Sequence, residues 1–176
     1  MTISKARLPD KSLLKTDSYD YIDSFQGFFF DKDGTVDSTK VGKSFFASGP
    51  KWVDKLFTCR NRVATLFGLK TSGKTIDRRM LLDSFNCEQG DQLGLFKVFD
   101  KTNDEVILGE DDKHLNFRVS LFIDKQTDDA TQKKLVISTT VKFNNWLGRL
   151  YFLPVRPFHR LIVPAMLKGI IKNMEN

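Results

Sequence analysis

The sequence predicts an α+β domain in which an antiparallel sheet is covered on one face by a long C-terminal helix. Apolar residues recur with a period of two between Leu93 and Asn144, and with a helical three-and-four spacing near the C-terminal end. The connections between the expected strands are too short to hold crossover helices, so neighbouring strands must run antiparallel. We expect a curved sheet of about five to seven strands, with further helices after the first strand.

The first strand is expected at Tyr19–Phe30, where alternate residues are aromatic or glycine on one side of the strand. A turn at Asp31–Gly34 follows, and Val41–Ala47 is predicted to form a short helix. Pro50–Phe67 has the apolar stripe of a second helix. The segment before the first strand, Met1–Lys15, shows no period and is expected to be a tail or a loosely docked segment.

Four more strands are expected, at Leu93–Phe99, Glu105–Gly109, Lys113–Asp124 and Lys134–Asn144. In the last two, apolar and polar residues alternate strictly, which predicts one face in the core and one in water. Thr71–Gln92 gives no clear prediction, because part of it fits a strand or a turn of helix equally well.

The C-terminal helix is predicted over Pro157–Met174, with Pro157 in the first turn and Pro164 bending the helix. Its wide apolar face must be buried against the sheet. Arg160, Lys168 and Lys172 interrupt the apolar run, so this segment is not a membrane span.

Composition favours a single domain over residues 1–176 with a large core, since 40% of the residues are hydrophobic and sixteen are Phe. The net charge of +6 is scattered among 22 acidic residues, so no nucleic-acid partner is expected. Cys59 and Cys87 have no CxxC spacing and no secretory signal follows Met1, which predicts a cytoplasmic protein with reduced thiols. With two histidines, neither a metal site nor a cofactor is expected.

The segment Gly68–Thr75 matches the phosphate-loop pattern GxxxxGK[ST], in which Lys74 would reach the phosphates and Thr75 would hold Mg²⁺. Leu121–Asp124 could supply the metal-binding carboxylate of such a site. However, a phosphate loop follows a buried parallel strand, whereas this segment follows an amphipathic helix. A nucleotide-binding protein is therefore the less favoured alternative.

The segment Phe28–Thr35 resembles the opening motif of haloacid-dehalogenase-like phosphatases, in which an Asp at a strand end is the nucleophile. That family next requires a Ser or Thr, then a Lys, then an acidic pair. Here Asp111 and Asp112 precede Ser138 and Thr139, so the order is wrong. A type I turn explains Asp31–Gly34 without catalysis.

Every second residue at the start of the strand expected at Lys113–Asp124 is polar: Asp112, His114, Asn116, Arg118 and Ser120. Asp112 is placed to orient His114, but Arg118 lies about 13 Å further along, so the set cannot form a compact catalytic cluster. A solvated outer face is the favoured interpretation, and the sequence does not say which face carries His114 and Arg118.

Three segments resemble an uncharacterised bacterial family of domains of unknown function: Trp52–Lys70, Gly109–Ser120 and Thr139–Leu167. The last contains the specific run WLGRLYF followed by PFHRLIVP. The resemblance implies the helix-grip fold of the birch-pollen-allergen and START-like (SRPBCC) superfamily, in which a curved sheet grips the C-terminal helix around an apolar cavity. It implies no reaction and no catalytic residues, which argues against an enzyme.

We therefore expect a protein that binds a small lipophilic molecule between the sheet and the C-terminal helix. The residues expected to line the cavity are Phe117, Val119, Leu121, Val141, Phe143, Phe158, Ile162 and Met166; those expected to supply polar contacts are Asp112, His114, Arg118, Trp146, Arg149, Tyr151 and His159. The same apolar side chains could instead fill the space. The alternative is a partner-binding or homo-oligomeric module that uses Asn145, Trp146, Arg149, Tyr151, Arg156, His159 and Arg160.

Overall fold

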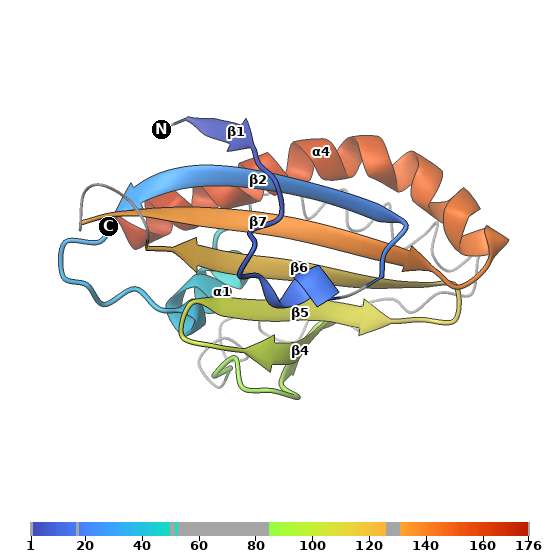
Figure 1. Ribbon diagram of the computed structural model, residues 1–176, viewed down its shortest axis with the longest axis horizontal. Helices are drawn as coiled ribbons and strands as arrows, with labels where there is room; N and C mark the ends of the chain where they lie inside the picture. Colours follow the sequence, from blue (N-terminus) through green and yellow to red (C-terminus); the bar gives the residue numbers. More distant parts are fainter. Residues whose placement is uncertain (1, 17, 50–51, 53–84, 126–130, 176) are drawn as a thin grey trace.

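The computed structural model describes residues 2–16, 18–49, 52, 85–125 and 131–175. In this part of the chain, seven strands form one antiparallel sheet in the order β1-β2-β7-β6-β5-β4-β3 (Figure 1). The strands are β1 (Ile3–Lys5), β2 (Tyr21–Phe30), β3 (Gln92–Leu93), β4 (Phe96–Lys101), β5 (Glu105–Asp111), β6 (Leu115–Asp124) and β7 (Gln132–Phe143). The helical elements are η1 (Leu13–Thr16), α1 (Ser38–Ala47) and α4 (Trp146–Met174). The predicted α+β class, antiparallel sheet and C-terminal helix are confirmed.

The long strands β2, β7 and β6 form the centre of the sheet, and their register follows the apolar parity of the sequence. Phe25 of β2 and Leu121 of β6 both pair with Ile137 of β7, so the three side chains lie in one row on the same face. All three are buried. This inner face is the one that packs against α4.

Helix α4 starts well before the predicted position, so the expectation that Pro157 begins the helix is wrong. The cap is Asn145, whose side-chain oxygen accepts a hydrogen bond from the Gly148 N–H at 3.2 Å. Pro154 and Pro157 lie inside the helix on its exposed side, where water can satisfy the carbonyl groups that lose their intrahelical partner. A side chain at Gly148 would collide with the carbonyl oxygen of His114, so glycine lets the helix start close to the sheet.

The C-terminal half of α4 and the short helix α1 cover the inner face of the sheet. Leu167, Ile170 and Ile171 of α4 have no exposed surface, and Val41 of α1 is equally buried. Helix α1 confirms the expected short helix and is capped by Asp37, whose carboxylate accepts a hydrogen bond from the Lys40 N–H at 2.8 Å. The two helices contact each other along the sheet.

The opposite, outer face of the sheet is covered in part by the N-terminal segment, which crosses the strands from β1 to η1 (Figure 1). The segment expected to be a tail or loosely docked therefore pairs with β2 and packs on β5 and β6. Ser120 and Ser138 are fully buried on this face, so the prediction of a solvated outer face is wrong at the centre of the sheet.

The buried carboxylate of Glu105 attaches the N-terminal segment to the outer face. It accepts hydrogen bonds from the Ser12 hydroxyl at 2.6 Å and the Leu13 N–H at 2.8 Å, and a third from the Ser120 hydroxyl. Only 1% of the Glu105 surface is exposed. Because all three donors converge on one carboxylate, the position of the segment depends on this residue.

Two expectations fall on residues outside the described part: the helix over Pro50–Phe67, apart from residue 52, and the pattern Gly68–Thr75. Within the described part, no helix is long and apolar enough to cross a membrane.

Candidate functional site

A cavity of about 360 Å³ lies between the inner face of the sheet and the helices α1 and α4. Its volume is at the lower end of the range usual for small-molecule sites, about 300–1,000 Å³. The described residues around it are mostly apolar: Phe45, Phe46, Leu95, Phe96, Leu115, Phe117, Val119, Ile137, Thr139, Val141, Tyr151, Phe152, Pro154, Val155, Phe158, His159, Ile162, Val163 and Met166. These side chains do not fill the space, so a hollow exists where the sequence allowed either outcome.

Aromatic rings from three elements form one wall of the cavity. Phe45 of α1 meets Phe96 of β4 edge-on with ring centroids 5.4 Å apart, and Phe96 meets Phe117 of β6 in the same way at 5.7 Å. Edge-to-face contacts of this kind favour one relative orientation of the rings. The wall is therefore held in shape by aromatic packing as well as by the sheet.

A polar cluster interrupts the apolar lining where α4 crosses β2. The His159 ring nitrogen Nδ1 lies 3.1 Å from the Asp23 oxygen Oδ2, which also accepts a hydrogen bond from the Tyr21 hydroxyl at 2.6 Å. Asp23 and His159 side chains are 14% and 18% exposed, so water screens their interaction little. The cluster links the helix to the sheet beside the cavity.

Two buried oxygen atoms of this region have no hydrogen-bond partner among the described residues. They are Oδ1 of Asp23 and Oγ1 of Thr139. The register of β2 and β7 sets these two residues directly opposite each other, which brings their Cβ atoms to within about 4.5–5.5 Å on the inner face. A buried polar atom without a partner costs about 1–3 kcal/mol, and an ordered water often supplies the partner at such a position.

The two atoms favour an uncharged hydroxyl over an acid. A hydroxyl group placed between them would donate its O–H to Asp23 Oδ1 and accept from the Thr139 hydroxyl. A carboxylate would be repelled by Asp23. Burial and the hydrogen bond to Asp23 raise the pKa of the Tyr21 hydroxyl, and Arg160 opposes this shift only in part, so Tyr21 stays neutral at pH 7.

The comparison with protein families matches residues 16–166 to a family described as a protein of unknown function, DUF2867. The match covers most of the chain. The chain belongs to the DUF2867 family. No curated protein and no solved structure matches it. All the described residues that line the cavity, and Asp23 with them, fall inside the DUF2867 region.

Six of the eight side chains expected to line a cavity do so in this DUF2867 domain: Phe117, Val119, Val141, Phe158, Ile162 and Met166. Leu121 lies on the same face but is fully buried in the main core. Phe143 packs against Phe152, with ring centroids 5.6 Å apart, in a second apolar cluster at the end of β7. Neither is among the residues around the cavity.

The polar residues of one parity in and just before β6 are not among the residues around the cavity. Arg118 lies on the outer face, where it pairs with Asp111 at 2.8 Å and stacks on the Phe99 ring at 3.5 Å from its centroid. His114 is buried beside the start of α4, with Nδ1 2.9 Å from the Asn145 amide nitrogen. Asp112 sits in the turn between β5 and β6, and its backbone N–H bonds to the Leu115 carbonyl at 3.2 Å. These contacts are all to neighbouring strands, turns and the start of α4.

The polar residues expected around the start of the last helix divide between two sides of α4. Tyr151 and His159 face the cavity, whereas Trp146 and Arg149 are exposed. Sequence reasoning missed Asp23 and Thr139. The available signal was their parity, because both share the apolar face of their strands with large hydrophobic residues.

Outside the cavity, the described residues bear on the metal-binding and phosphatase patterns. Among them, no group of three or more His, Cys, Asp or Glu side chains could hold a metal ion. Burial raises the pKa of the Cys87 thiol to about 12, so this thiol is not a nucleophile near neutral pH. Asp31 of the phosphatase-like motif is buried and receives hydrogen bonds from Lys133, Thr35 and Val36, which supports the turn interpretation.

Proposed function

We propose that this DUF2867 domain has a helix-grip fold of the START-like (SRPBCC) superfamily and binds a small, uncharged amphipathic molecule in its cavity. The observation that carries the proposal is the mostly apolar hollow between the sheet and the helices, with Thr139 and His159 as polar groups in its lining. An apolar site with a few placed polar groups is typical of small-molecule binding. The ligand class supported best is an aliphatic or aromatic alcohol.

The binding site is tested with 1-aminoanthracene, a neutral probe whose fluorescence rises in apolar surroundings. We expect the wild-type protein to bind the probe, and octan-1-ol to displace it. Val119→Phe adds a ring to the cavity lining, and we expect it to weaken probe binding about tenfold or more, because the lost space cannot be recovered in a packed interior.

Leu153→Phe is the matched control, because it adds the same ring on the solvent side of α4, where Leu153 is 65% exposed. It should bind the probe as the wild type does. Circular dichroism and thermal unfolding check that both variants are folded, and Ile137→Phe repeats the test on the neighbouring strand if Val119→Phe is not. Equal affinity in a folded cavity variant and the control would contradict the proposal.

The alternative of a protein-interaction module without a ligand has one observation in its favour. Several of its predicted residues, including Trp146, Arg149, Arg156 and Arg160, lie on the exposed side of α4. This surface is compatible with a ligand-filled cavity on the other side of the helix. A partner that binds this exposed side of α4 would therefore not compete with a ligand in the cavity.

A further inference from the structure

The first half of α4 exposes large apolar side chains to solvent. Trp146 is 69% exposed, Leu153 65% and Leu161 64%, with Leu150 at 46%. Their spacing of three, four and eight residues, with exposed Pro157 between them, sets them on one side of the helix. The resulting outer α4 face, Trp146, Leu150, Leu153, Pro157 and Leu161, runs for about 22 Å.

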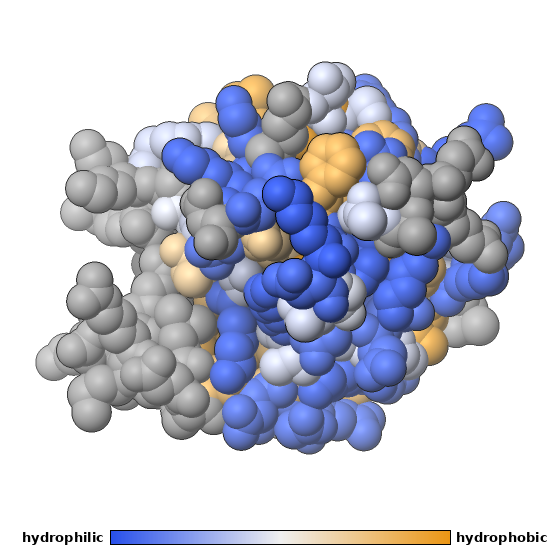
Figure 2. Space-filling view, turned by 90° about the vertical axis from the view of Figure 1, so that its left-hand side faces the viewer, coloured by the Kyte–Doolittle hydropathy of each residue, from blue (hydrophilic) through white to orange (hydrophobic). Residues whose placement is uncertain are grey.

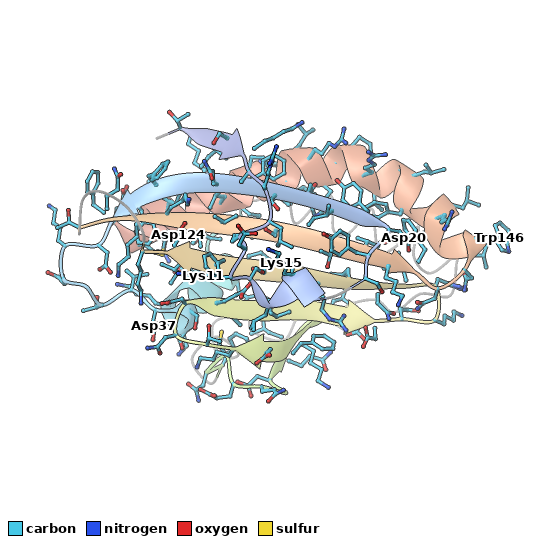
Figure 3. The ribbon with its side chains drawn as sticks, viewed as in Figure 1. Lys11, Lys15, Asp20, Asp37, Asp124 and Trp146 are labelled. Atoms are coloured by element: carbon cyan, nitrogen blue, oxygen red, sulfur yellow. The ribbon has the colours of Figure 1, made fainter. Side chains whose placement is uncertain are left out.

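Trp146, at the start of this face, lies at one end of the molecule and projects away from the sheet (Figure 3). At the opposite end, where α4 terminates, the described residues that face the viewer are mainly hydrophilic (Figure 2). A row of exposed large apolar side chains on one face of a helix marks an interaction site, whereas scattered ones do not.

The charged side chains that α4 itself carries are all basic. Over its 29 residues, α4 contains five basic side chains, Arg149, Arg156, Arg160, Lys168 and Lys172, and no acidic one. The three arginines are spaced by seven and four residues, so they follow one flank of the apolar face. Asp20 pairs with Arg149 at 3.6 Å, and both side chains are exposed. Arg156 stacks on the Tyr21 ring at 5.2 Å from its centroid.

An apolar strip flanked by arginine is the pattern of a helix that lies in the interface of an anionic lipid bilayer. We propose that the outer α4 face docks on an anionic lipid surface. The apolar side chains enter the acyl boundary, and the arginines stay at the level of the phosphate groups, where guanidinium binds phosphate in a bidentate manner. The helix remains folded and does not span the bilayer.

The docking face adjoins the cavity. Phe158 and Pro154 both line the cavity and are exposed, with Phe158 at 49%. A lipophilic molecule dissolved in the bilayer would therefore meet the cavity wall where the protein touches the membrane. This last step rests on the proposed ligand binding, whereas the docking itself does not.

The test is co-sedimentation of the full chain with vesicles of phosphatidylcholine containing about 30% phosphatidylglycerol. We expect binding to these vesicles, weak binding to pure phosphatidylcholine, and loss of binding in about 0.5 M NaCl, where the charges are screened. The double variant Leu153→Glu with Leu161→Glu should reduce the partition coefficient about tenfold or more. Phe28→Glu is the matched control, because Phe28 is 44% exposed on the outer face of β2, and it should bind as the wild type does.

Equal binding of the double variant and the control would overturn the proposal, as would no binding of the wild type to anionic vesicles. Light scattering distinguishes a second copy of the chain as the occupant. A wild-type dimer that the double variant converts to a monomer, without vesicle binding, would also overturn it. Probe binding by the double variant should be unchanged, so failure of membrane docking and failure of the cavity proposal give different results.

Discussion

Replacing Lys133 by Met is expected to lower the free energy of unfolding by about 3–5 kcal/mol at pH 7, because it leaves a buried carboxylate without its counter-ion. Asp31 and Lys133 side chains are 3% and 9% exposed and in direct contact. Asp31 also accepts hydrogen bonds from the Thr35 and Val36 N–H groups, both at 3.1 Å. These contacts hold the turn after β2 against the start of β7.

The effect of Lys133→Met should depend on pH. Burial raises the pKa of Asp31, but Lys133 and the two N–H groups outweigh burial, and the net shift is below the ordinary value of 3.8. A carboxyl with a lowered folded-state pKa stabilises the protein above its unfolded pKa, and the contribution is lost as pH falls through the folded pKa. In the variant, acid neutralises the uncompensated carboxylate. The difference between wild type and variant should therefore shrink below about pH 4.

Urea unfolding at pH 7 and in acid measures both effects. Lys134→Met is the matched control, because the adjacent Lys134 pairs with Asp124 at 2.9 Å on the outer face, with both side chains more exposed. The control should lose less than about 1 kcal/mol. A Lys133→Met protein as stable as the control would show that Asp31 does not depend on its partner.

The second large effect is expected from Glu105→Ala, which should cost about 3 kcal/mol or more in unfolding free energy. Removing the carboxylate leaves the Ser12, Leu13 and Ser120 donors without their shared acceptor. Because the N-terminal segment depends on those bonds, it should detach before the domain unfolds.

Limited digestion with trypsin measures this detachment as the rate of cleavage after Arg7, Lys11 and Lys15. In Glu105→Ala these sites should be cut much faster than in the wild type under conditions where the sheet stays folded. Glu88→Ala is the control, since Glu88 pairs with Lys101 through a side chain that is 67% exposed. Unchanged cleavage in a destabilised Glu105→Ala protein would assign the loss of stability to the sheet alone.

Much of the sheet was predictable because its signal is local. The alternation of Leu115 to Ile123 and of Leu135 to Phe143 set both the strands and the face that packs on α4. The start of α4 was predicted wrongly because Pro157 fits a first helical turn, whereas the helix is capped twelve residues earlier by Asn145. Tertiary packing extends the helix past its prolines.

The candidate site was only partly predictable for a different reason. The cavity lining follows from parity, but the pairing of Asp23 with Thr139 depends on the register of two strands far apart in the chain. The burial of Ser120 and Ser138 was missed in the same way, because the covering segment near Ser12 carries no periodic signal of its own. Neither the register between distant strands nor the path of an irregular segment produces a local sequence pattern from which it could be predicted.

Calorimetric titration of the wild type and of Thr139→Val with octan-1-ol tests the central claim most directly, with 1-chlorooctane as a ligand of similar shape that lacks the hydroxyl. The account predicts that the wild type binds the alcohol, that Thr139→Val weakens this binding about tenfold, and that 1-chlorooctane binds both proteins equally. The ligand-free variant should also be more stable by about 1 kcal/mol, because an unpaired buried hydroxyl is replaced by a methyl group. No binding to the wild type, or equal alcohol affinity for the two proteins, would contradict the account.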